Sequence, residues 1–136
     1  MTVSQIILSS IGKVPSKKNR MRVYGNRMVK DKGVKDFEHK LKQDAQRLMD
    51  SIQSPPLTGP VEMELEIITG DKRKRDLQNY FGSICDALND VVYEDDSQIQ
   101  TITAQKLYKK GIWSYTITIT PINGDDNGSE KKRDQR

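Results

Sequence analysis

The sequence predicts a single small α/β domain of the α+β type, in which a mixed β-sheet carries two main helices. Apolar and polar residues alternate from Val61 to Ile67, which is typical of a half-buried strand. Apolar residues recur at spacings of three and four from Val34 to Ile52, which indicates an amphipathic helix. The chain has 136 residues, of which 34% are hydrophobic, so it has room for one domain with a small core.

The first half of the chain is expected to run strand, hairpin, helix, strand. An apolar, β-branched run predicts a strand from Val3 to Ile11. A hairpin follows from Met21 to Lys30, with Tyr24-Gly25-Asn26-Arg27 at its turn. Asp31 is the expected N-cap of the first helix, and Pro55-Pro56 ends that helix. The alternating strand then extends from Val61 to Thr69.

The second half adds a helix and two strands. Spacing of apolar residues predicts a helix from Leu77 to Val91, followed by an acidic turn at Glu94-Asp95-Asp96. Two strands are expected at Ile99 to Tyr108 and at Ile112 to Thr120. Residues 123–136 contain no apolar side chain, so we expect a disordered charged tail after a domain of residues 1–122.

The composition excludes several classes of protein. No apolar run approaches the ~20 residues of a membrane span, and the N-terminus lacks the basic segment of a secretion signal. Cys85 is the single cysteine, which fits a reducing compartment. With one cysteine and one histidine, a zinc site of the usual Cys/His type is excluded, so any metal must be a hard cation held by oxygen ligands.

The charges are segregated along the chain, although the net charge is only +4. Nine basic residues and one acidic residue lie between Lys13 and Lys35, whereas five acidic residues and no basic residue lie between Asp86 and Asp96. This pattern favours a protein that holds a polyanion next to a cluster of carboxylates. The alternative is ordinary solvated surface charge.

Carboxylates stand at both ends of the second predicted helix. Asp76 directly precedes the helix, and Asp95 and Asp96 follow it. If the strands before and after this block are neighbours, we expect the two ends of the block to lie close together. Carboxylates from separate elements are what a Mg²⁺ site requires. The alternatives are a helix N-cap for Asp76 and a polar turn for Asp95-Asp96.

Two basic clusters are candidates for contact with DNA phosphates. One of them immediately precedes Asp76, where it suits a phosphodiester backbone presented to a metal; a solvated loop is the alternative. The candidate residues are Lys17, Lys18, Asn19, Arg20, Lys72, Arg73, Lys74 and Arg75.

Three segments together resemble the RusA-type Holliday junction resolvases, which are small dimeric endonucleases typical of phages and prophages. The segments are Lys72 to Asn79, Cys85 to Asn89 and Val92 to Ile99. The loop Pro15 to Arg20 is also similar to that family's N-terminal loop, and the resemblance covers roughly residues 4 to 120.

The resemblance implies a homodimer that cuts branched DNA, specifically a four-way junction, by paired nicks. It assigns catalysis to Asp76 and Asp96, and it implies that both hold Mg²⁺ with help from Asp95 and Gln78; Mn²⁺ is the alternative ion. It further implies the cytoplasm of a bacterium or a phage-infected cell and no membrane partner.

The chain departs from the family pattern at two positions. Gln78 stands where the family has a second aspartate, and Gly82 stands where it has a lysine. A Gln carbonyl still binds a hard cation but removes one negative charge, and the missing lysine removes a group that stabilises charge at the reacting phosphate. Lys72, Lys74 and Lys106 are candidate replacements. Two alternatives therefore stay open, namely a branched-DNA-binding protein without cleavage and a nuclease for flaps or forks.

Overall fold

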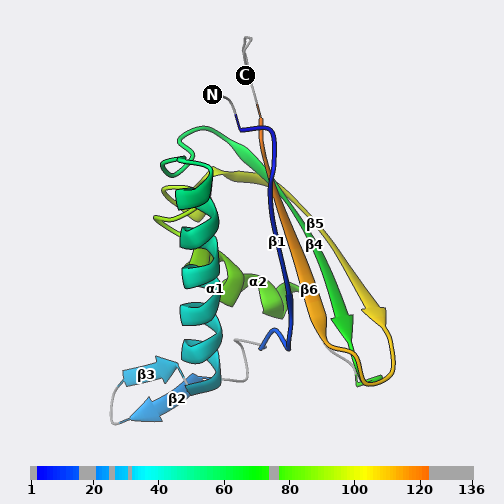
Figure 1. Ribbon diagram of the computed structural model, residues 1–136. Coiled ribbons are helices and arrows are strands. Elements are labelled where there is room, and N and C mark those ends of the chain that lie inside the picture. The colour runs from blue at the N-terminus through cyan, green and yellow to red at the C-terminus, as the bar shows by residue number, and fades with distance from the viewer. Residues whose placement is uncertain (1–2, 16–20, 25–26, 31, 74–76, 123–136) are drawn as a thin grey trace.

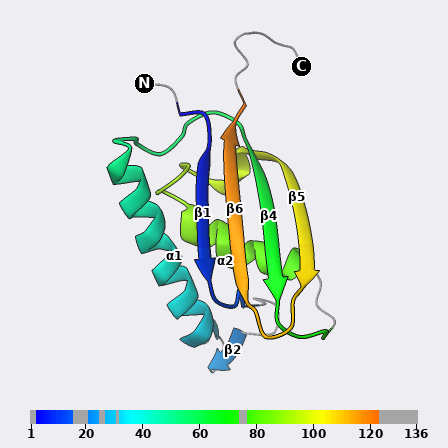
Figure 2. The same cartoon turned by 45° about the vertical axis from the view of Figure 1, so that its right-hand side comes forward.

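A four-stranded mixed sheet forms the centre of the molecule, in a computed structural model that describes residues 3–15, 21–24, 27–30, 32–73 and 77–122. The strands lie in the order β1-β6-β4-β5 (Figures 1 and 2). β6 is antiparallel to both of its neighbours, whereas β4 and β5 are parallel. Their bounds are β1 Ile6–Ile11, β4 Val61–Thr69, β5 Ile99–Tyr108 and β6 Ser114–Pro121.

Two helices lie on one side of this sheet, as Figure 1 shows. They are α1, Lys32–Ser51, and α2, Gln78–Leu88. A separate two-stranded hairpin, β2 Met21–Tyr24 and β3 Arg27–Lys30, precedes α1. The α+β class and the hairpin predicted from the sequence are confirmed. In the part of the chain that the structure describes, no helix is long and apolar enough to cross a membrane.

The core lies between the sheet and the two helices. Every second residue of β4 is buried, and its glutamates point to the opposite, solvent-facing side. Leu41 and Met49 of α1 and Ile84 and Leu88 of α2 are at most 1% exposed and belong to the same core. The period-two pattern of β4 therefore fixes which face of the sheet receives the helices.

Some element boundaries differ from the sequence prediction. α2 ends at Leu88 rather than Val91, because Asp90 adopts the left-handed conformation at φ 65° and donates its backbone N–H to the Tyr93 carbonyl at 2.8 Å. Val91 is still buried, but in the turn that follows the helix. β1 begins at Ile6 rather than Val3, whereas β4 and β5 have the predicted bounds. Asp31 and the tail of residues 123–136 lie outside the described residues.

Candidate functional site

The loop after β4 is the first part of the candidate site. Thr69 ends the strand and donates its hydroxyl to the Asp71 carbonyl at 3.2 Å, and the Asp71 carboxylate accepts the Arg73 backbone N–H at 3.1 Å. These bonds turn the chain sharply away from the sheet and leave Lys72 and Arg73 exposed. Asp76, which is three residues after Arg73, lies outside the described residues.

Gln78 is the first residue of α2, and its side chain is exposed. An exposed amide at this position can offer its carbonyl oxygen to a cation or to substrate. Gly82 lies one turn further along the same helix. Because glycine has no side chain, Gly82 supplies no positive charge at the position where the family has a lysine.

Asp95 has a structural role in the turn that precedes β5. It caps the short 3₁₀ helix η2, Asp96–Gln98, by accepting the Ser97 backbone N–H at 2.9 Å, while its own N–H donates to Gln98 Oε1 at 2.9 Å. The hydrogen bond from Ser97 holds the pKa of the Asp95 carboxyl below its usual range. Asp95 therefore stabilises this turn, and its part in binding a metal stays a prediction.

Asp96 is held differently from its neighbour. It is half-buried in the first turn of η2, and among the described residues no hydrogen bond or ion pair engages its carboxylate. Its charge acts on Tyr93, a fully buried residue whose hydroxyl donates to the Cys85 carbonyl at 3.4 Å. Burial raises the pKa of the Tyr93 phenol, and nearby negative charges, including those of Asp96 and Asp86, raise it further.

Asp86 is a neighbour that the sequence pattern did not single out. It is half-buried on α2, and its negative charge raises the pKa of the same buried phenol as that of Asp96 does. Residue spacing gave no signal of this, because the bond from the Tyr93 hydroxyl to the carbonyl of the preceding residue, Cys85, arises from tertiary packing.

The connections to the two ends of the acidic block leave the sheet at opposite ends. β4 and β5 are neighbours, but they are parallel, with Val61 opposite Ile99 and Thr69 opposite Tyr108. Asp95 and Asp96 therefore lie beside the start of β4, whereas the loop toward Asp76 leaves its end, about 30 Å away for nine residues of strand. Asp76 itself lies outside the described residues, so the expectation that both ends of the block lie close together stays a prediction. Among the described residues, no three Asp, Glu, His or Cys side chains gather as metal ligands.

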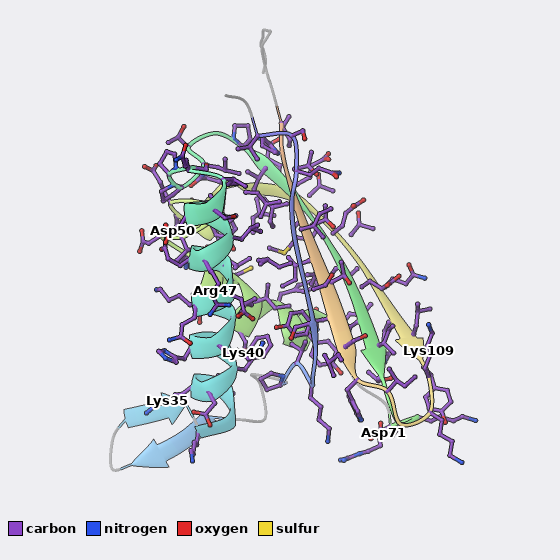
Figure 3. The ribbon with its side chains drawn as sticks, in the orientation of Figure 1. Lys35, Lys40, Arg47, Asp50, Asp71 and Lys109 are labelled. Atoms are coloured by element: carbon purple, nitrogen blue, oxygen red, sulfur yellow. The ribbon has the colours of Figure 1, made fainter. Side chains whose placement is uncertain are left out.

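The predicted DNA-contact residues are described only in part. Lys72 and Arg73 are exposed at the end of β4, and the same end of the sheet carries the labelled Asp71 and Lys109 in Figure 3. Lys106 is half-buried on β5, opposite Ile67. The remaining predicted contacts lie outside the described residues; they are Lys17, Lys18, Asn19, Arg20, Lys74 and Arg75.

The donor groups suit a hard cation. The Asp96 carboxylate and the Gln78 amide present oxygen atoms, which are the ligands that Mg²⁺ and Mn²⁺ prefer. No curated protein matches the chain. The family model of endodeoxyribonuclease RusA matches residues 12–120, a span that includes both ends of the acidic block and both basic clusters. With most of its length covered by this match, the chain belongs to the RusA endodeoxyribonuclease family.

Proposed function

We propose that the protein is a Mg²⁺-dependent endonuclease that resolves four-way DNA junctions by paired nicks, with Mn²⁺ as the alternative ion. Its membership of the RusA endodeoxyribonuclease family supports the nuclease activity. The observation that carries the mechanism is that Asp96 lies beside the start of β4, whereas the loop toward Asp76 leaves the other end of that strand. That arrangement favours metal sites built from two copies of the chain.

The free edge of β5 supports such a pairing. β5 bonds to β4 along one side, and no described strand pairs with its other side. It is ten residues long, and its sequence IQTITAQKLY contains one charged residue, Lys106, and no proline. Long edge strands with few charges and no proline readily pair with another strand, which monomeric proteins avoid. We therefore place the interface of a homodimer along β5.

Antiparallel pairing of two β5 strands joins the separated halves of the site. A two-fold axis through the middle of β5 places the start of each strand beside the end of the other. Asp96, directly before β5, then lies on the side where the loop after β4 of the second copy emerges. Each metal site would take Asp96 from one copy and Asp76 from the other, and the two-fold axis would repeat the site on the second DNA strand.

The residues of the chain have separate tasks in this proposal. A bound divalent cation supplies a water of lowered pKa and neutralises charge at the phosphate. Asp76 and Asp96 hold the cation, and Gln78 adds a neutral oxygen where the family has a carboxylate. Asp95 keeps η2 folded and thereby fixes the position of Asp96. Lys72 and Arg73 hold the DNA backbone, which positions the substrate without reading its sequence.

A second candidate function is junction binding without cleavage. Gln78 and Gly82 favour it, because together they remove one metal-binding charge and one cation near the phosphate. The two candidates make opposite predictions for a single assay, because binding requires only the basic surface and cleavage requires the carboxylates.

The test is incubation with a synthetic four-way junction, labelled on each strand in turn, with and without Mg²⁺. The proposed function predicts symmetric nicks that require the metal and disappear in Asp96→Asn. A stable shifted complex with no cleavage under any metal would support the binding protein. Flap, fork and plain duplex substrates in the same assay rank the preferred shape of DNA.

A further inference from the structure

Two aromatic rings flank the end of β4, each with a lysine above it. Lys13 Nζ lies 4.6 Å from the centre of the Trp113 ring, and Lys72 Nζ lies 5.3 Å from the centre of the Tyr108 ring. Tyr108 ends β5 opposite Thr69, and Trp113 directly precedes β6, so one ring stands on each side of β4. A cation over a ring face in this way is a favourable electrostatic contact.

Backbone bonds hold the rings in place. Gly12 donates its N–H to the Trp113 carbonyl at 2.8 Å, and Gly111 donates to the Gly70 carbonyl at 2.9 Å. A Cβ atom on Gly70 would lie 2.4 Å from Trp113 Nε1, so the ring packs directly on the glycine backbone. Lys109 completes the frame by donating its N–H to the Thr69 carbonyl at 3.0 Å. The Trp113 ring is therefore a fixed part of the surface, and the backbone on both sides of Tyr108 is held in place.

Positive charge dominates this end of the sheet. Its exposed basic residues among those described are Lys13, Lys72, Arg73, Lys109 and Lys110. Among the described residues of the same loops, the acidic one is Asp71, which accepts the Arg73 backbone N–H. Tyr108 is 44% exposed and Ile112 is 51% exposed, so apolar surface lies among the cations. Figure 3 shows Lys109 and Asp71 at this end, on the far side of the view from α1.

We propose that this basic aromatic end, formed by Lys13, Lys72, Tyr108, Lys109, Lys110 and Trp113, is a DNA-binding surface. The four lysines of this surface bind phosphates. The exposed Tyr108 ring stacks on a base that is unpaired at a branch point. Combining cations with aromatic faces is how proteins hold unpaired nucleic acid without reading its sequence. The proposal rests on the proposed function for its substrate, and it adds to the two predicted basic clusters the residues Lys13, Tyr108, Lys109, Lys110 and Trp113.

Nucleic acid fits this surface better than an acidic protein does. An acidic protein would need only the lysines for binding. The two aromatic rings add flat apolar faces, which the bases of a nucleic acid can use. The surface also lies where the chain leaves β4 toward Asp76. DNA bound here would therefore run past the segment that supplies one metal-binding carboxylate.

Trp113 is the single tryptophan of the chain and reports directly on this surface. We expect its fluorescence to change when the full-length protein is titrated with a four-way junction without metal, so that no cleavage occurs. Lys109→Ala/Lys110→Ala should weaken junction binding about tenfold and reduce the slope of log K against log salt by about 1–2, because each lost phosphate contact contributes about 0.9. Tyr108→Ala should weaken binding to single-stranded DNA more than binding to duplex DNA.

The matched control is Lys42→Ala/Arg47→Ala, which removes two exposed positive charges from α1. It should leave the salt slope close to that of the wild type. Wild-type affinity and slope in Lys109→Ala/Lys110→Ala would overturn this inference even if the enzyme cuts junctions. Weakened binding in that variant would support the surface even if the wild-type protein never cleaves DNA, so failure of the two proposals is distinguishable.

Discussion

Asp95 and Asp96 are adjacent in the sequence, yet the structure gives them different tasks. Asp95 accepts the Ser97 N–H and caps η2, whereas no described residue engages the Asp96 carboxylate. The capping bond lowers the pKa of Asp95, so its contribution to stability is present above its usual pKa near 3.8 and is lost as the pH falls through the lowered value. Near neutral pH, the turn therefore holds Asp96 in place.

Exchanging each aspartate for asparagine separates these two tasks. Asp96→Asn should reduce cleavage at least 100-fold and leave junction binding intact or tighter, because it removes negative charge that faces phosphate. Asp95→Asn should retain most activity, since asparagine is also a good N-cap. Single-turnover cleavage and gel-shift assays measure both effects. Equal loss in the two variants would show that Asp95 also binds the metal.

A substitution at Gln78 tests whether the chain tolerates the carboxylate that its family has at this position. Gln78→Asp should raise the cleavage rate or lower the Mg²⁺ concentration needed for half-maximal rate, because a carboxylate binds the cation more strongly than an amide does. A Mg²⁺ titration of the cleavage rate measures the effect. An unchanged or lower rate would contradict the assignment of Gln78 to the metal site.

Gly70 supports Trp113 through its lack of a side chain. Gly70→Ala should destabilise the fold by about 1–3 kcal/mol, because its Cβ would lie 2.4 Å from Trp113 Nε1 and displace the ring. Gly59→Ala is the control, since a Cβ there meets nothing within 4 Å. Urea unfolding followed by tryptophan fluorescence compares the two variants. Equal stability would show that the loop rearranges freely.

At the scale of elements, periodicity predicted the strands better than it predicted the site. β4 and β5 have the expected bounds because alternation of side chains is a local property. Whether the two strands are parallel or antiparallel is not a local property, and it determines the end of the sheet at which each connection to the acidic block leaves. The helix between them was the missed signal, because a helical crossover between neighbouring strands requires them to be parallel. The end of α2 was missed because Asp90 adopts a positive φ that apolar spacing does not reveal.

The two edge strands of the sheet provide a test of the β5 interface. Ile102→Lys adds a charge to the free edge of β5, where Ile102 is 38% exposed, and should convert a dimer into a monomer. Ile7→Lys makes the same change on β1, at a residue 54% exposed, and should leave the dimer intact. Light scattering at micromolar concentration gives the masses. A dimeric Ile102→Lys protein would exclude β5 as the interface.

At the scale of the whole molecule, the connections to the two acidic segments leave the sheet at opposite ends. One chain places Asp96 beside the start of β4 and sends the loop toward Asp76 from its other end. A mixed sheet with a long free edge offers a direct way to join them, by continuing across a two-fold axis. The paired sites that result match the two equivalent strands of a four-way junction. Neither this arrangement nor the free edge is visible in residue spacing, because both arise from the order of the strands.

Subunit mixing tests this central claim most directly. Asp76→Asn and Asp96→Asn chains, each with its own affinity tag, are co-expressed, and the heterodimer is isolated through both tags. If each site takes one aspartate from each copy, one site of the heterodimer loses both aspartates and the other keeps both. The heterodimer should then nick one strand of a junction, although both homodimeric variants are inactive. No cleavage by the heterodimer, in an assay where the wild-type protein cuts both strands, would contradict the shared site.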